Sequence, residues 1–225
     1  YIGAGTRNTG NFLKIPLGAR VEALGGAYIS VADDIEGINS NPAGLALEDM
    51  YLIGFSYGMY FLELKYNFLG FMVPTENFGN ISFSTVYLDY GKQEGYDEIG
   101  NYTGDFMCYD LGVTLTISDE VFSGLYTGFN LHYVESKLGE YKGAGVLGDI
   151  GILWNPRFYN RRMFLGLVLK NFGISMKVDQ QANEPSLTYG IGFSIYPVSK
   201  LKHHVLVSLD YLKSEDTADI LRGGV

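Results

Sequence analysis

The chain has 225 residues, 18% of them charged, and a formal net charge of −9 at pH 7. This acidic balance argues against a nucleic-acid partner, which would need a basic surface. The single cysteine, Cys108, excludes an internal disulfide and a cysteine-based zinc site. Abundant glycine (30), tyrosine (18) and phenylalanine (14) favour β-structure with one face in lipid and small residues on the other.

The first predicted element is an N-terminal segment, residues 1–49, that does not alternate cleanly and is expected to form a domain separate from the strands. The stretch Ala32–Glu36 predicts a short helix with Asp33 as its N-cap and a glutamate at the third helical position. Asn41 and Pro42 should end that helix within about two turns.

Period-2 alternation predicts that residues 50–225 form antiparallel strands. From Met107 to Ile117, for example, every second residue is large and mostly apolar, and the residues between are small or polar. Nine strands are expected near 51–60, 63–74, 79–90, 105–118, 125–137, 146–155, 163–174, 187–197 and 204–213, and a tenth from Ala218. Several reach roughly ten residues, the length that a tilted strand needs to cross a bilayer. A soluble β-sandwich remains the alternative, but its strands would average nearer about 5–6 residues.

The predicted connections fall into two classes that alternate along the chain. Short turns are expected near 75–79, 119–124, 156–162 and 198–203, and mostly longer, more acidic loops at 91–104, 177–185 and 214–219. Outer-membrane barrels place short turns in the periplasm and long loops outside. The pattern therefore predicts an integral protein of the bacterial outer membrane, with the N-terminal segment starting on the periplasmic side.

Both ends of the sequence suggest a processed or partial chain. There is no initiator methionine or signal peptide, so Tyr1 is interpreted as lying near a mature N-terminus. The stretch Ile220–Val225 stops inside an apparent strand, while a barrel in lipid must close. We therefore expect the C-terminal strands of the barrel to lie outside this sequence.

Motifs for enzyme chemistry are weak. A G-x-G-x-x-G pattern at Gly143–Gly148 is followed by a strand, whereas the dinucleotide fingerprint needs a helix there. His132, His203 and His204 lack the spacing of metal ligands, and His132 is expected on the small, polar face of its strand. No nucleophile elbow is present. The sequence therefore predicts no enzyme activity, no cofactor and no metal site.

The N-terminal segment carries the most specific motifs. In order, they are Gly18-Ala19-Arg20, Gly25-Gly26-Ala27, Ala32-Asp33-Asp34 and Asn41-Pro42-Ala43-Gly44-Leu45-Ala46. At this spacing they resemble the N-terminal signature of the PorV/PorQ family, relatives of the FadL-type outer-membrane β-barrels. The resemblance implies a transmembrane barrel of about 14 strands, of which roughly the first 9–10 are here. It also implies that the segment folds inward as a plug. The local alternative is that Asn-Pro-Ala-Gly makes only a tight turn before the first strand.

The resemblance also implies a function. The first hypothesis is a non-enzymatic accessory in protein secretion, of the type IX kind, or in surface assembly, with protein partners bound by the outer loops and the plug. The plug signature would be Gly18, Arg20, Gly25, Gly26, Asp33, Asp34, Asn41, Pro42 and Gly44. The alternative is a FadL-type transporter of hydrophobic small molecules, with Leu24, Tyr28, Ile29 and Ile35 lining a ligand pocket or gate. A purely anchoring role is the third. Membrane lipid is an expected partner in every case.

Overall fold

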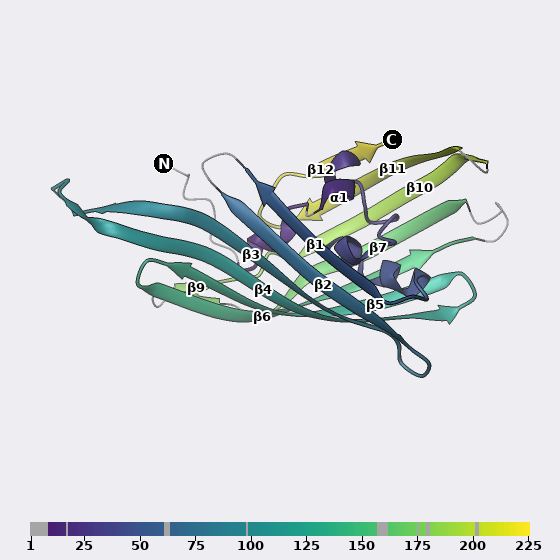
Figure 1. Cartoon of the computed structure of the whole chain (residues 1–225), viewed down its shortest axis with the longest axis horizontal. Helices are drawn as coiled ribbons and strands as arrows, with labels where there is room; N and C mark the ends of the chain where they lie inside the picture. Colours follow the sequence, from purple (N-terminus) through teal and green to yellow (C-terminus); the bar gives the residue numbers. More distant parts are fainter. Residues whose placement is uncertain are drawn as a thin grey trace.

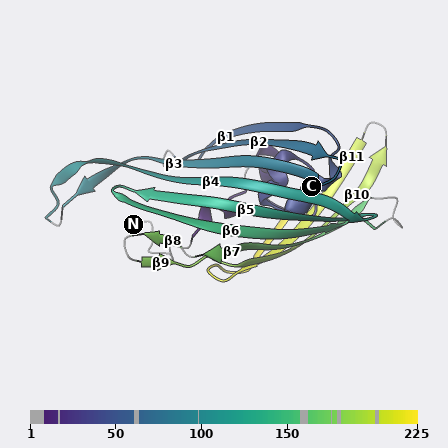
Figure 2. The same cartoon turned by 90° about the horizontal axis from the view of Figure 1, so that it is seen from below.

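In the computed structural model, the described residues are 9–16, 18–60, 64–97, 99–156, 162–174, 176–178, 181–200 and 203–225. Ten strands form one antiparallel sheet that curves around the N-terminal residues (Figures 1 and 2). The strands are β1 (Leu52–Met59), β2 (Lys65–Thr75), β3 (Gly79–Tyr96), β4 (Tyr102–Phe122), β5 (Leu125–Leu138), β6 (Tyr141–Trp154), β7 (Met163–Ile174), β10 (Thr188–Lys200), β11 (His203–Ser214) and β12 (Ile220–Gly224). Between β7 and β10, a small separate hairpin is formed by β8 (Met176–Val178) and β9 (Gln181–Asn183).

The predicted all-β class is confirmed, and the large sheet is a meander in which each strand pairs with the next along the chain, except that β7 pairs with β10 across the β8–β9 hairpin. The ten strands do not close into a barrel. Within the described part of the chain, β1 pairs with β2 and β12 pairs with β11, and these two outer strands are the edges of the sheet.

Two of the predicted loops were wrong. The acidic stretch 91–104 is mostly strand: β3 and β4 continue as a ladder through Lys92↔Met107 and Glu94↔Asp105, after a bulge that follows Asp89. This extension projects as an arm beyond the neighbouring strands (Figures 1 and 2). The stretch 177–185 contains most of the β8–β9 hairpin. Charged and glycine residues hid the pairing in the first stretch, and charged and amide residues hid it in the second, because backbone hydrogen bonds do not require apolar side chains.

The two faces of the sheet differ in chemistry. The outward face carries large apolar side chains on neighbouring strands, such as Leu115 (44% exposed), Ile150 (45%) and Leu209 (49%). The residues between them point inward and are buried. Over β4 to β11 these inward residues are mainly small or polar, as expected, but over β2 and β3 they include Phe68 and Leu88.

The N-terminal segment, residues 9–49, lies against the inner face of the sheet. Its helical turns are η1 (Asn11–Lys14), α1 (Ala19–Ala23), η2 (Ile35–Asn39) and η3 (Pro42–Leu47). Apolar residues of the segment form one core cluster with inward residues of β2, β3, β5 and β6: Phe12, Leu13, Ile35, Ile38, Leu45, Tyr66, Phe68, Met72, Val86, Leu88, Val134 and Leu147. No helix among the described residues is both long and apolar enough to cross a membrane.

The predicted N-cap of the helical turn was wrong by one residue. The cap of η2 is Asp34, whose Oδ1 accepts a hydrogen bond of 2.9 Å from the backbone N–H of Gly37. Asp33 instead pairs with Arg20. The carboxylate that caps is the one whose backbone is extended immediately before the turn.

The segment runs along the strands from one end of the sheet to the other. At one end, the backbone N–H of Thr9 donates to Glu184 O (3.2 Å), close to the start of β10. At the other, the Asn80 side chain donates to Glu48 O (2.6 Å), beside the turn between β2 and β3. Thr9 therefore lies at the opposite end of the sheet from the start of β1.

Candidate functional site: the interface between the N-terminal segment and the sheet

Opposed glycines on neighbouring strands make room for the segment. Three pairs lie directly opposite in the register: Gly54↔Gly70, Gly128↔Gly151 and Gly166↔Gly192. A Cβ atom at any of these six positions would overlap or crowd a neighbouring atom, and in every case an atom of the segment is among those met. Ile35 covers the first pair, Pro42 the second and Ile29 the third. The glycines therefore let the segment lie directly on the backbone of the sheet.

Polar inward side chains of the sheet bind the backbone of the segment. Asn80 donates to Leu45 O (2.6 Å), Asn130 to Ile38 O (3.0 Å), Lys170 to Asn39 O (2.5 Å) and Ser194 to Ser30 O (3.1 Å). Asp210 Oδ2 accepts from the N–H of Ile29 at 2.8 Å. Irregular backbone enclosed by a sheet needs such partners, because buried peptide groups without hydrogen bonds are costly. The polar inner face thus holds the segment in one position.

Asn41 connects the segment internally and to the sheet. Its Nδ2 donates to Ile29 O (2.8 Å) and to Ile152 O (3.2 Å), and its Oδ1 accepts from Ala43 N–H (3.1 Å). The residue is fully buried. It is the N-cap of η3, and Pro42 occupies the start of that helical turn. Asn-Pro-Ala-Gly therefore has a structural role, as the local alternative expected, but it begins a capped helical turn in place of a simple tight turn.

The remaining signature residues also have structural roles. Gly18, Gly25 and Gly26 have φ angles of 107°, 60° and 76°, which favour glycine. A Cβ at Gly44 would overlap the backbone of Ala32. These positions flank α1 or hold η3 close to the rest of the segment.

Arg20 forms a small charged cluster with its neighbours. It ion-pairs with Asp33 and with Asp34, the latter at 3.1 Å, and lies 5.5 Å from the centroid of the Tyr28 ring. The Tyr28 hydroxyl donates to Asp34 Oδ2 at 2.5 Å. The cluster joins the start of α1 to the turn before η2, so these signature residues stabilise the fold of the segment itself.

The four residues expected to line a pocket or gate are all buried: Leu24 (7% exposed), Tyr28 (0%), Ile29 (3%) and Ile35 (6%). Leu24 and Tyr28 belong to a cluster inside the segment, and Ile35 belongs to the main core. Of the four, Ile29 lines a small cavity between the segment and the sheet. The structure therefore separates these residues among three environments.

A buried chain of polar residues crosses three strands behind the segment. His132 Nδ1 is 2.8 Å from Thr114 Oγ1, and His132 Nε2 is 2.8 Å from Asp149 Oδ2. The three are at most 1% exposed, so a substrate has no access to the threonine oxygen. His132 lies on the inner face, as expected. The grouping itself was missed, although all three residues fall on the small, polar face of their strands. No cluster of three or more His, Cys, Asp or Glu suited to a metal is found among the residues that the structure describes.

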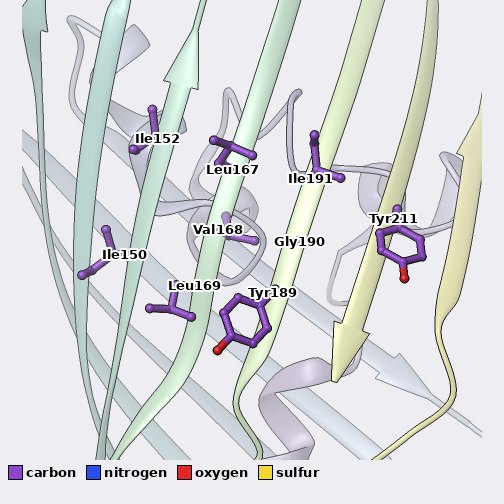
Figure 3. A pocket seen from close by; sticks show the side chains of 9 residues that line it. All are labelled: Ile150, Ile152, Leu167, Val168, Leu169, Tyr189, Gly190, Ile191 and Tyr211. Atoms are coloured by element: carbon purple, nitrogen blue, oxygen red, sulfur yellow. The ribbon is translucent and has the colours of Figure 1, made fainter. Parts of the chain in front are cut away.

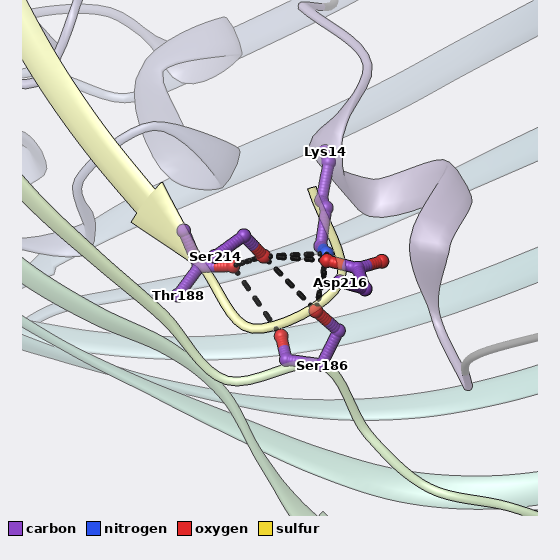
Figure 4. Close-up of polar contacts among 5 residues, drawn as sticks. All are labelled: Lys14, Ser186, Thr188, Ser214 and Asp216. Carbon is purple, nitrogen blue, oxygen red and sulfur yellow. Dashed lines mark hydrogen bonds and ion pairs between the residues drawn. The ribbon is translucent and has the colours of Figure 1, made fainter. Parts of the chain in front are cut away.

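Lys14 ties the start of the segment to the sheet (Figure 4). Its Nζ donates to Ser186 Oγ (2.7 Å), Ser214 Oγ (2.8 Å) and Asp216 Oδ1 (2.6 Å). Burial raises the pKa of the Asp216 carboxyl, but the hydrogen bonds from Lys14 and the two serines outweigh this and hold its pKa well below the usual range. Sequence reasoning missed this cluster because Lys14 and Asp216 lie 202 residues apart.

A second hollow lies on the outward face, over β6, β7, β10 and β11 (Figure 3). It is a shallow groove of about 400 Å³ with walls formed largely by outward apolar side chains such as Ile150, Leu167 and Ile191. The groove lies on the outward face of the sheet. The interior cavity lies on the inner face, where Ile29 of the segment lines it.

Comparison with known proteins corrects the family that the signature suggested. The model of an uncharacterised protein family, UPF0164, matches residues 4–211. A "UPF0164 protein" of Treponema pallidum (strain Nichols) is 27% identical over 205 residues, covering 82% of this chain and 47% of the relative. The chain thus spans about half the length of the relative it matches.

The assignment to the PorV/PorQ family was therefore wrong. The physical reason lies in what the signature encodes. Its glycines occupy positions that have positive φ angles or close backbone contacts. Its asparagine, Asn41, caps a helical turn that begins at Pro42. Any segment that fits this closely inside a sheet needs such residues, so the motif describes a local geometry. The chain belongs to the uncharacterised protein family UPF0164.

Proposed function

We propose that the protein is an integral outer-membrane protein, in which this sheet forms the wall of a β-barrel and the N-terminal segment is its plug. The observation that carries the proposal is the chemistry of the outward face. Large apolar residues stand exposed at every second position, for example Leu131 (46%), Leu167 (50%) and Ile191 (49%), while the intervening inward residues are buried. A face this apolar is unfavourable in water and suited to lipid.

Closure of the barrel would need further strands between β12 and β1. An open sheet edge in lipid leaves backbone N–H and C=O groups without partners. The length of the Treponema relative, of which this chain matches 47%, supports the idea that a longer chain provides those strands.

The connections support one orientation of the protein in the membrane. Short turns join β2 to β3 and β4 to β5, and the arm of β3 and β4 extends from the opposite end. With short turns in the periplasm, the arm would be outside the cell. The first strand would then start in the periplasm, and the Thr9 end of the plug would lie near the outer surface.

For its role, we propose a non-enzymatic accessory in protein secretion or surface assembly that acts through contacts at the outer surface. The arm supports this, because it displays Glu94, Tyr96 and Tyr102 on strands that extend past the rest of the sheet. Transport of hydrophobic molecules through the interior has less support. Among the described residues the interior cavity is about 50 Å³, and three cationic side chains line it.

Trp154 gives the test of membrane location. It is the single tryptophan of the 225 residues, lies at the end of β6 and is 42% exposed. The full-length protein, with any further tryptophan replaced by phenylalanine, would be folded into vesicles containing brominated lipid. We expect strong quenching of Trp154 fluorescence, greatest with bromines placed near the headgroups. Quenching by aqueous iodide but not by brominated lipid would contradict the proposal.

The proposed role is tested separately by photo-crosslinking in cells. A benzophenone amino acid replaces Tyr96 on the arm, and the matched control replaces Leu115 on the outward face of β4. We expect discrete protein adducts from position 96 and none of the same mass from position 115. Equal adduct patterns, or none from the arm, would contradict a role in surface contacts.

A further inference from the structure

A small cavity lies where the N-terminal segment meets β7, β10, β11 and β12. Its volume is about 50 Å³, and three residues with cationic side chains, Lys14, Lys170 and Arg222, line it together with Asn39. Lys14 and Asn39 come from the segment, and the other two from strands β7 and β12. The charges of Lys14 and Arg222 act on Lys170. Like charges brought together in a partly enclosed space require compensation.

The acids near these cations do not line the cavity. Asp216 pairs with Lys14 at 2.6 Å, and Asp149 and Asp210 interact electrostatically with Lys170 and Arg222. All three carboxylates lie outside the residues that form the wall. The charged residues that line the cavity are therefore all cationic, while the one carboxylate that interacts with each of them lies outside the wall.

Two of the cations have N–H groups with no hydrogen-bond partner among the described residues. Lys14 uses its three N–H groups on Ser186, Ser214 and Asp216. Lys170 uses one of three, on Asn39 O at 2.5 Å, and Arg222 uses one of five, on Gly26 O at 3.3 Å. Among the described residues this leaves two donors on Lys170 and four on Arg222.

Asn39 is the second, independent sign of a ligand. The residue is 6% exposed, yet neither its Oδ1 nor its Nδ2 has a hydrogen-bond partner among the described residues. Buried amides without partners are rare and costly in folded proteins. An oxygen-bearing ligand in the cavity would accept from Nδ2.

We propose that this cavity binds one small oxyanion of the phosphate or sulfate class. Arg222 and Lys170 would donate to its oxygens, Asn39 Nδ2 would add a third contact, and Lys14 would contribute charge. A cavity of about 50 Å³ admits an ion of a few heavy atoms and excludes an acyl chain. The oxyanion site would exist whether the outward face of the sheet meets lipid or water. The proposal is therefore independent of the proposed function.

Equilibrium dialysis of the purified full-length protein with radiolabelled inorganic phosphate tests the site. We expect saturable binding of about one phosphate per chain, competed by sulfate. Arg222→Gln should weaken binding at least tenfold, since it removes the donor-rich cation. Lys142→Gln is the matched control, because that lysine is largely exposed and pairs with Glu135, away from the cavity. It should bind phosphate as the wild type does.

If Arg222→Gln fails to fold, Asn39→Asp provides a second test of phosphate binding. The substitution hardly changes side-chain size but puts a negative charge in the wall, so it should abolish phosphate binding. Dihexanoyl phosphatidic acid should compete far more weakly than free phosphate, because its chains cannot enter. Absence of saturable binding by the wild type, wild-type affinity in folded Asn39→Asp, or stronger competition by the lipid would each overturn the proposal.

Discussion

At the scale of single residues, the structure depends on a few buried polar side chains with several partners each. Asn41 makes three hydrogen bonds, one to the sheet and two within the segment. Its amide satisfies peptide groups that no water can reach, since the residue is fully buried. Residues of this kind fix the position of the segment on the sheet.

Asn41→Ala should therefore destabilise the protein. It removes a helix cap and the hydrogen bonds to Ile29 O and Ile152 O, and we expect a loss of about 1–3 kcal/mol in the free energy of unfolding. Denaturant unfolding in mild detergent would measure it. Asn101→Ala is the control: this asparagine is exposed in the arm and bonds only with Asp97, so its loss should stay within about 0.5 kcal/mol. Equal small losses in both variants would contradict the role given to Asn41.

The Lys14 cluster makes stability depend on pH in a defined direction. The pKa of Asp216 is lowered in the folded protein, so the unfolded chain takes up the proton first as the pH falls. The contribution of Asp216 is thus complete at neutral pH. It is lost progressively as the pH falls below the ordinary aspartate value of about 3.9.

The check compares unfolding midpoints of wild type and Asp216→Asn from pH 7 to pH 3. The wild type should be the more stable at pH 7, and the difference should shrink as the acid range is entered. Lys14→Met should behave like Asp216→Asn, and the double variant should add little to either. A difference that is constant with pH would contradict the assignment.

At the scale of elements, alternation located ten of the strands because burial of one face has a period of two residues. It did not find β8 and β9 or the outer parts of β3 and β4. In the arm, Gly95↔Gly104 and Glu94↔Asp105 pair without an apolar face. The helical turns of the segment were located only roughly, because η2 and η3 are set by contacts with the sheet and by single caps at Asp34 and Asn41.

The glycine pairs give a prediction for the contact between segment and sheet. A Cβ at Gly128 would overlap the backbone of Pro42 and Ala43, whereas a Cβ at Gly223 would meet nothing closer than 3.8 Å. We expect Gly128→Ala to cost about 1–3 kcal/mol of unfolding free energy, because neither backbone can move aside easily.

Gly223→Ala, with an unstrained backbone and free space, should leave that energy within about 0.5 kcal/mol. The two variants would be compared by denaturant unfolding and by protease sensitivity of residues 9–49. If Gly128→Ala were as stable and as resistant to protease as Gly223→Ala, the segment would not lie on this part of the sheet.

At the scale of the whole molecule, alternation in the sequence predicted the two-faced sheet, and only the family resemblance implied that the N-terminal segment lies inside it. Neither predicted how the two join. The contacts that hold the segment link residues far apart, such as Asn130 with Ile38 and Lys170 with Asn39. Polar residues at single positions on several strands carry no local pattern that reveals a shared partner. The wrong family assignment has a related cause, because the signature reflects the backbone geometry within the segment alone.

We propose that the outward face lies in lipid, and an arginine placed at two depths distinguishes a lipid surrounding from a watery one. Leu115 is in the body of β4, opposite Phe83 and Leu131, whereas Phe122 is the last residue of that strand. Both side chains are exposed, at 44% and 70%. The measurement is the free energy of unfolding of Leu115→Arg and Phe122→Arg, after folding of the full-length protein into lipid bilayers.

In lipid, arginine near the bilayer midplane costs about 2–4 kcal/mol and near the interface about 0–1 kcal/mol. We therefore expect a large loss of stability for Leu115→Arg and a small one for Phe122→Arg. On a sheet whose outward face met water, both substitutions would be nearly neutral, within about 0.5 kcal/mol. Near-neutral values for both variants would mean that the outward face does not lie in lipid.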